Sequence, residues 1–227
     1  MGTLRAGQTA GGARLMSAAE HVIYVHGLWM SGGEGLLLRH RLARELGATV
    51  HAFSYSAVTD GMEEITEQLR AFVAAIDPPR VHFVGHSLGG LVIYRFFERF
   101  AQQPPGRVVF LGSPCVASRA AVEASHSRFI SALMGRSVAE ELLTPRQRRW
   151  CADRPLGIIA GSYSFGVGQF LAGFEDDSDG TVAVSETRLP GAAAHIVVPV
   201  SHMGMLVSAR VARETAHFLR AGRFSLL

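Results

Sequence analysis

The hexapeptide GHSLGG at residues 85–90 constrains the fold of this chain more than any other feature. It contains the pattern Gly-x-Ser-x-Gly, and it joins a short apolar run to an apolar segment suited to a buried helix. The pattern predicts a strand, a sharp turn with Ser87 at its apex, and a helix. A serine in so tight a turn is strained, and Gly85 and Gly89 leave the space that the turn needs.

Strand-like and helix-like segments alternate along the rest of the chain. Expected strands lie at 21–27, 48–56, 80–85, 107–113, 155–162 and 194–201, and expected helices at about 34–46, 60–76, 91–103 and 205–221. Most of these strands are continuous apolar runs, which are typical of a parallel sheet covered on both faces. We therefore predict the α/β class, with an open, mostly parallel, doubly wound sheet of about six strands.

The chain has 227 residues, which suits one well-cored domain. We expect residues 1–20 to form a flexible lead-in and residues 21–227 to form a single domain. The stretch from about 115 to 154 carries two amphipathic helical patterns and is longer than a simple crossover requires. It predicts a helical cap insertion over the site, with a surface elaboration that has no part in substrate handling as the alternative.

Composition excludes several classes of function. The net charge is only +3 and the arginines are scattered, so no nucleic-acid partner is expected. No apolar run reaches the roughly 18 residues of a membrane span. The first twenty residues lack the apolar core of a secretory signal, which favours a cytoplasmic protein. Cys115 and Cys151 are then expected to be free thiols, although a disulfide between them stays open.

A serine hydroxyl needs a base beside it to act as a nucleophile. In enzymes with this turn, the acid and the histidine follow the serine in that order. His202 lies just beyond the last expected strand, where the base belongs. Asp179 is our choice of acid because Gly-Thr-Val follows it and makes a turn into an extended segment. Asp176 and Asp177 remain alternatives, and the whole acidic group could instead be a solvated loop or a cation site.

A developing oxyanion needs two N–H donors. The first is the backbone of Leu88, and the second is expected from Leu28 in the loop after the first strand, with Trp29 as the fallback. Side chains expected to contact substrate are Trp29, His86, Phe170 and Met203. The apolar stretches that contain Phe170 and Met203 are equally consistent with ordinary core packing. The mechanism requires no cofactor and no metal.

With these residues in place, the chain resembles the α/β-hydrolase family, in its small bacterial lipase and esterase branch. The matching pieces are YVHGLW at 24–29, VGHSLGGLV at 84–92, LGSP at 111–114, DGTV at 179–182 and SHMGM at 201–205. His-Gly before an apolar residue is similar to the oxyanion loop of bacterial lipases, and Asp-Gly-x-Val is similar to their acid loop. The family's usual first two strands are missing, which implies a reduced sheet.

The resemblance implies a serine hydrolase that cleaves carboxylic acyl esters through an acyl-serine intermediate. One alternative is an acyl thioesterase or acyltransferase that acts on groups bound to CoA or to an acyl-carrier protein. A second alternative, from another class, is a non-catalytic binding protein on the same scaffold. The missing secretory signal favours a small intracellular ester or thioester as the substrate.

Overall fold

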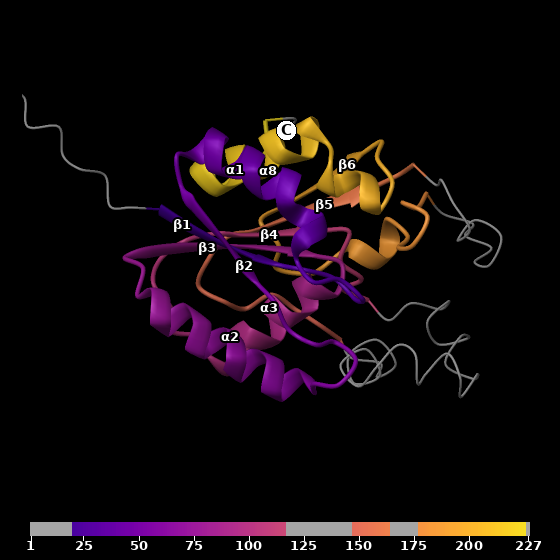
Figure 1. Cartoon of the computed structure of the whole chain (residues 1–227). Helices are drawn as coiled ribbons and strands as arrows, with labels where there is room; N and C mark the ends of the chain where they lie inside the picture. Colours follow the sequence, from indigo (N-terminus) through magenta and orange to yellow (C-terminus); the bar gives the residue numbers. More distant parts are fainter. Residues whose placement is uncertain (1–19, 117–146, 164–176, 226–227) are drawn as a thin grey trace, which may run out of the picture.

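The computed structural model describes residues 20–116, 147–163 and 177–225, and Figure 1 shows how they are arranged. The strands are β1 (Glu20–Val25), β2 (Thr49–Phe53), β3 (Arg80–His86), β4 (Val108–Leu111), β5 (Leu156–Gly161) and β6 (Ala194–Val198). They form one parallel sheet in the order β2-β1-β3-β4-β5-β6. The strand order reverses between β1 and β3, and open α/β sheets bind ligands at the carboxyl ends of the strands at such a point.

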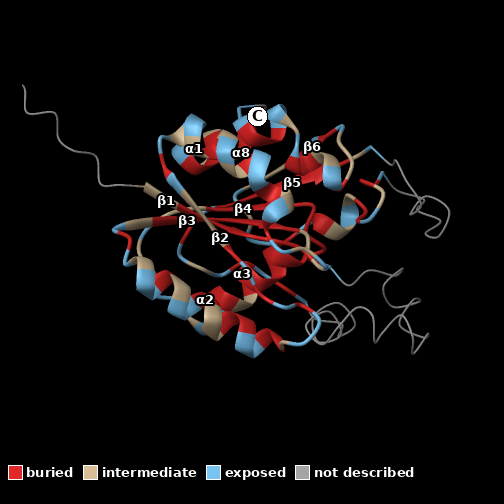
Figure 2. Ribbon diagram, in the orientation of Figure 1, coloured by how far each residue is buried: buried red, intermediate tan, exposed pale blue. Residues whose placement is uncertain are grey.

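Helices cover both faces of the sheet (Figure 1). The helices α1 (Leu36–Leu46) and α8 (Ala209–Ala221) pack together on one face, and α2 (Met62–Ile76) and α3 (Leu88–Arg99) pack together on the other. The strands between them are largely buried, as the red ribbon in Figure 2 shows. The predicted doubly wound α/β fold with about six strands is therefore confirmed, and the sheet is parallel throughout the described residues.

Short 3-10 helices complete the described elements: η1 (Gly33–Gly35), η2 (Ser185–Thr187) and η3 (Met203–Leu206). The prediction of one continuous helix over 205–221 is wrong, because η3 ends before α8 begins. Ser208 separates them in an extended conformation, and its side chain accepts a hydrogen bond from the N–H of Val211 at 3.3 Å. Capping by this serine satisfies a free N–H of the first turn and so favours a new helix start.

Parts of the predicted domain layout lie outside the described residues, namely 1–19 of the lead-in and 117–146 of the cap insertion. Glu20, which we placed in the lead-in, already belongs to β1. Cys115 is buried, Cys151 is exposed, and both are free thiols, as expected. In the described part of the chain, no helix combines the length and the apolar character that crossing a membrane would require.

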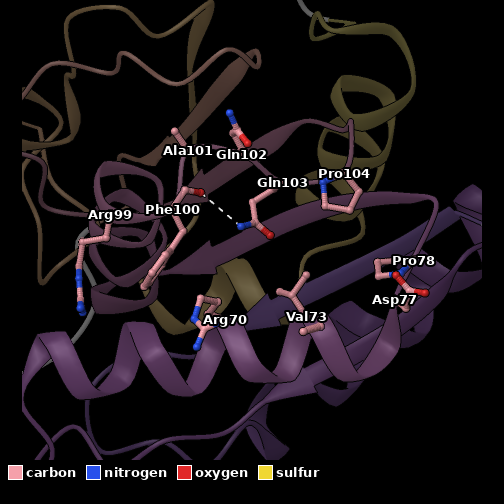
Figure 3. Close-up of a pocket in the computed structure, with 11 residues that line it drawn as sticks. Arg70, Val73, Asp77, Pro78, Arg99, Phe100, Ala101, Gln102, Gln103 and Pro104 are labelled. Atoms are coloured by element: carbon pink, nitrogen blue, oxygen red, sulfur yellow. Dashed lines mark hydrogen bonds between the residues drawn. The ribbon is translucent and has the colours of Figure 1, made fainter.

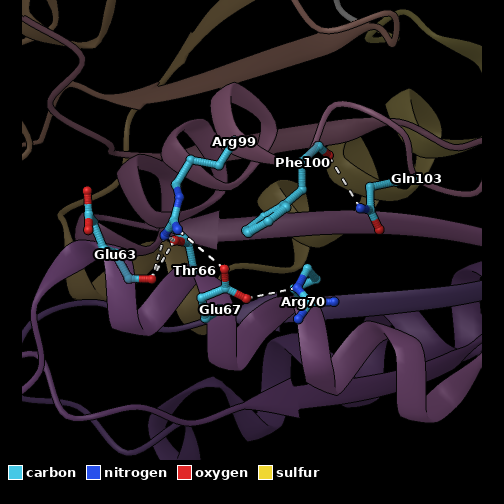
Figure 4. Close-up of polar contacts among 7 residues, drawn as sticks. All are labelled: Glu63, Thr66, Glu67, Arg70, Arg99, Phe100 and Gln103. Carbon is cyan, nitrogen blue, oxygen red and sulfur yellow. Dashed lines mark hydrogen bonds and ion pairs between the residues drawn. The ribbon is translucent and has the colours of Figure 1, made fainter.

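A cluster of polar contacts joins α2 to α3 (Figure 4). Arg99 donates hydrogen bonds to the carbonyl of Glu63 and to the hydroxyl of Thr66, each at 2.6 Å. Its guanidinium also lies 3.3 Å from the carboxylate of Glu67, which accepts a second hydrogen bond from Arg70 at 2.8 Å. The carboxylate of Glu67 is thus shared by two arginines and offsets part of their positive charge.

Arg154 ties the chain before β5 to the ends of β3 and α3. It is buried, and its guanidinium lies 4.4 Å from the ring centroid of Phe97. It donates hydrogen bonds to the carbonyls of Pro104 at 2.7 Å and Val81 at 3.4 Å. Burial lowers its pKa to about 10, so it keeps its charge at neutral pH.

We expect Arg154→Lys to lower the free energy of unfolding by about 1–3 kcal/mol, because an ammonium cannot form the planar fork of donors that these carbonyls accept. Urea denaturation of the wild type and the variant measures the difference. Arg70→Lys, at an exposed position, is the control and should stay within about 0.5 kcal/mol of the wild type. Equal stability of all three proteins would contradict this account.

Candidate active site

Ser87 lies between β3 and α3 with φ 54° and ψ −124°, a backbone conformation that L-residues seldom adopt. Its N–H donates to the carbonyl of Leu111 at 2.9 Å, which fixes the turn against β4. A Cβ at Gly89 would lie 2.1 Å from the carbonyl oxygen of Val25, so α3 can approach β1 only with glycine there. The predicted strand, sharp turn and helix around Ser87 are confirmed.

Asp179 and His202 form a closely bonded pair. Nδ1–H of His202 donates to Oδ2 of Asp179 at 2.7 Å, and the N–H of His202 donates to the Asp179 carbonyl at 2.9 Å. Oδ1 of Asp179 accepts from the N–H groups of Thr181 at 2.9 Å and Val182 at 2.8 Å. The turn that follows Asp179 therefore holds a buried carboxylate in one orientation against the imidazole.

Two other carboxylates competed for this role in the sequence. Asp177 is exposed, and Asp176 lies outside the described residues. In the parts of the chain that the structure describes, no group of three or more histidine, cysteine, aspartate or glutamate residues could hold a metal ion. The contact of Asp179 with His202 supports Asp179 as the acid of the proposed set.

The pair lies beside the turn that carries Ser87. Gly112 directly follows Leu111, whose carbonyl holds Ser87, and a Cβ at Gly112 would lie 3.2 Å from Nδ1 of His202 and 2.9 Å from Oδ2 of Asp179. The structure therefore places Asp179 and His202 beside Gly112, next to the residue that holds the Ser87 turn, at the carboxyl end of the sheet. Within the described residues the Ser87 hydroxyl forms no hydrogen bond with His202, so that link is still open in this conformation. Catalytic hydrogen bonds often tighten only when substrate binds.

His86 is fully buried beneath this pair. Nε2–H of His86 donates to the carbonyl of His202 at 3.2 Å, and the two ring centroids lie 4.7 Å apart. Burial, followed by repulsion from His202, lowers the pKa of His86 to about 3, so the ring is neutral at physiological pH. Its Nδ1 is buried without a hydrogen-bond partner among the described residues. His86 thus contacts His202, and its contact with substrate stays a prediction.

The two expected oxyanion donors also lie near Ser87. Leu88 is the first residue of α3, and the N–H groups of a first helical turn have no partner inside the helix. A Cβ at Gly27 would lie 3.0 Å from Cβ of Ser87, which places the loop carrying Leu28 against the serine. Neither the N–H of Leu28 nor that of Leu88 donates a hydrogen bond to any residue that the structure describes.

His26 and Tyr55 belong to the site, and our reading of the sequence missed both. The Tyr55 N–H donates to Nε2 of His26 at 3.3 Å, so the proton of the neutral ring is on Nδ1. Nδ1–H then donates to the carbonyl of Gly27 at 2.8 Å. The Tyr55 hydroxyl donates to the His26 carbonyl at 2.8 Å, and the two rings stack with centroids 4.3 Å apart. Burial lowers the pKa of His26 and so favours this neutral form.

This network fixes one peptide plane of the loop. No described peptide bond is cis, and in a trans peptide the carbonyl and the following N–H point in opposite directions. Because His26 binds the carbonyl of Gly27, the N–H of Leu28 points away from the His26 ring. The sequence signal for His26 is its place directly before Gly27 at the end of β1, whereas Tyr55 carries no comparable signal.

The remaining residues expected to contact substrate have different positions. Trp29 is 64% exposed with φ 57°, and Met203 is 49% exposed directly after His202. Phe170 lies outside the described residues. Trp29 and Met203 therefore offer apolar surface next to the site, and their contact with substrate stays a prediction.

A cavity of about 500 Å³ lies elsewhere, between the end of α2 and the chain that follows α3 (Figure 3). Phe100 lines it at the far end of α3, about 20 Å along that helix from Ser87. Arg70 and Arg99 also line it, and both are paired with Glu67. This cavity is separate from the residues expected to do chemistry.

We expect the ring signals of His86 in an NMR titration to stay constant from pH 8 to pH 5, because its folded pKa of about 3 lies below its ordinary value of 6.5. The unfolded chain binds the proton more readily, so the stability that neutral His86 contributes is lost as pH falls from about 6.5 toward 3. A His86 signal that titrates near pH 6.5 would contradict the buried neutral ring.

Comparison with known proteins supports the fold. A profile described as the alpha/beta hydrolase family matches residues 22–218. Similar solved structures include the lipase BlEst2 of Bacillus licheniformis in mature form, 18% identical with a TM-score of 0.72 over 89% of this chain and 91% of that chain. The pyrethroid hydrolase PytH is 17% identical, with a TM-score of 0.64 over 90% of this chain and 99% of that chain.

The RedJ thioesterase from the prodiginine biosynthetic pathway of Streptomyces coelicolor is 14% identical, with a TM-score of 0.57 over 89% of this chain and 85% of that chain. A search of curated proteins found no match. At these identities the structural likeness shows the fold alone, whereas the family profile spans nearly the whole described sheet. From that match and the parallel six-stranded sheet, the chain belongs to the α/β-hydrolase family.

Proposed function

We propose that this protein is a serine hydrolase that cleaves carboxylic esters through an acyl-Ser87 intermediate. The observation that carries the proposal is the strained Ser87 turn at the sheet end where Nδ1 of His202 is bonded to Asp179 at 2.7 Å. Membership of a hydrolase family supports it, as do the lipase and the pyrethroid hydrolase among the similar structures.

In the proposed reaction, Nε2 of His202 removes the proton of the Ser87 hydroxyl as its oxygen attacks the ester carbonyl carbon. Asp179 holds the imidazole in the required tautomer and stabilises the imidazolium that forms. The imidazolium then gives its proton to the departing alcohol oxygen, which leaves the acyl group on Ser87. A water molecule, activated in the same way, releases the carboxylic acid and restores the serine.

The oxyanion of each tetrahedral intermediate would accept hydrogen bonds from the N–H groups of Leu28 and Leu88. Both groups are free of partners among the described residues, and both lie beside Ser87. Losing one such donor typically raises the barrier by about 3–4 kcal/mol. Trp29 stays the fallback donor, and its exposed ring, together with Met203, is proposed to contact the acyl or alcohol group.

A thioesterase or acyltransferase would use the same three residues with a different leaving group or acceptor. The likeness to the RedJ thioesterase favours keeping this alternative, which would add CoA or an acyl-carrier protein as a partner. Rates on acyl-CoA, acyl-carrier protein and p-nitrophenyl esters of the same acyl chain separate the two functions. Labelling of Ser87 by a fluorophosphonate separates both from a non-catalytic binding protein.

We expect Ser87→Ala to abolish turnover of short p-nitrophenyl esters and labelling by a fluorophosphonate, while the unfolding midpoint changes little. Ser113→Ala is the matched control, because Ser113 is also a buried serine that follows a strand at this end of the sheet. It should retain activity. Full activity of Ser87→Ala would refute the nucleophile assignment.

We expect His26→Ala to lower kcat on the same esters by about 100-fold with little change in KM, because the Leu28 N–H loses its fixed direction. His26→Asn should recover part of kcat, since its amide can donate to the Gly27 carbonyl in place of Nδ1. Tyr55→Phe keeps the main-chain bond to Nε2 and should have a smaller effect. A change in KM alone, or no recovery in His26→Asn, would contradict this positioning role of His26.

A further inference from the structure

Charge is distributed unevenly between the two helical faces. The helices α1 and α8, together with Arg223 just after α8, carry seven arginines and two glutamates. The arginines are Arg39, Arg41, Arg44, Arg210, Arg213, Arg220 and Arg223. One of these glutamates, Glu214, is buried and accepts hydrogen bonds from Ser225. Glu45 is thus the exposed carboxylate of this face.

The arginines of α1 and α8 have no carboxylate partner in the described part of the chain. Arg41 and Arg220 instead donate to the main-chain carbonyls of Val207 and Glu45. On the opposite face, each of Arg70, Arg95 and Arg99 forms an ion pair with a glutamate, as Figure 4 shows for two of them. The positive charge of the α1 and α8 face therefore remains available to an anionic partner.

Five of these arginines form what we call the basic face: Arg41, Arg44, Arg210, Arg213 and Arg220. Arg41 and Arg44 share one side of α1, and the other three recur on one side of α8 at spacings of three and seven residues. A crevice of about 170 Å³ between the helices is lined by Arg41, Arg44 and Arg213, and by Glu45 as its one carboxylate. The outer sides of both helices are exposed in Figure 2.

Apolar side chains continue the basic face toward the active-site end of the sheet. Leu36 and Leu37 begin α1, and Met203 and Val207 follow His202 in sequence; all four are exposed. Leu37 lies one turn before Arg41, and Arg41 contacts the carbonyl of Val207, so these apolar groups adjoin the arginines. Exposed apolar side chains gathered at one place indicate a surface that binds something.

We propose that the basic face, together with the adjoining exposed side chains of Leu36, Leu37, Met203 and Val207, docks on the surface of an anionic lipid bilayer. Arginines attract anionic head groups, and adjacent leucine, methionine and valine side chains can enter the boundary between head groups and acyl chains. The crevice between α1 and α8 is too small to receive a helix of another protein, whereas outward side chains on two parallel ridges suit an extended surface. The carboxyl end of the sheet, where Ser87 lies, would then be turned toward the lipid.

The experiment measures co-sedimentation of the full chain with vesicles of phosphatidylcholine, alone and with phosphatidylglycerol added. We expect binding only to the anionic vesicles, weakened by salt because exposed charges are screened. Arg44→Glu with Arg213→Glu should lower the partition coefficient by at least about tenfold. Leu36→Ser with Leu37→Ser should weaken binding without changing its dependence on salt.

Arg70→Glu with Arg95→Glu is the control, because it makes the same change of net charge on the opposite face. It should bind as the wild type does once circular dichroism shows that it is folded. Ser87→Ala should keep vesicle binding even where hydrolysis is lost, so failure of the proposed function and failure of the docking surface are distinguishable.

The proposal is overturned if neutral and anionic vesicles bind equally, if neither binds, or if the control pair loses as much binding as Arg44→Glu with Arg213→Glu. Preferential capture by an acidic protein or a nucleic acid, with no vesicle binding, would assign the face to that partner instead. Trp29 gives a second readout, since it is exposed while Trp150 is buried. Its emission should shift to shorter wavelength on anionic vesicles, and an unchanged spectrum of bound protein would overturn the proposed orientation.

Discussion

The close approach of α3 to the end of β1 is the constraint on which the site depends. Gly89 permits it, because any Cβ there would collide with the carbonyls of Val25 and His26. The same approach forces Ser87 into its strained turn and brings the loop of Gly27 against it. One steric requirement thus sets the positions of Ser87 and of the free N–H groups of Leu28 and Leu88, independently of the hydrogen bonds around them.

The second requirement is electrostatic. Three neutral or paired histidines lie around the serine: His26 in the loop, His86 beneath it and His202 bonded to Asp179. Burial favours the uncharged forms of His26 and His86, so neither would repel the imidazolium that the proposed mechanism forms on His202. Of these three histidines, His202 is the one whose ring is hydrogen-bonded to a carboxylate.

The sequence predicted those features of the fold and the site that depend on residues close to one another in the chain. The continuous apolar strands, the Gly-x-Ser-x-Gly turn and the Asp-Gly-Thr-Val turn all express short-range steric or hydrogen-bonding rules, and the structure contains each of them. The break before α8 escaped prediction because Ser208 competes with a helical pattern that runs through it. The role of His26 escaped because its tautomer is fixed by an N–H that follows a different strand.

Two hydrogen bonds join Asp179 to His202, one between their side chains and one between their main chains, and this has a mechanical consequence. The proposed acid and base are joined into one unit, so a shift of residues 177–182 moves the His202 ring with them. The alignment of the imidazole with the Ser87 hydroxyl then depends on the position of this joined pair relative to the turn between β3 and α3. It does not depend on three side chains that move independently. A small displacement of the joined pair therefore changes the position of the imidazole relative to Ser87.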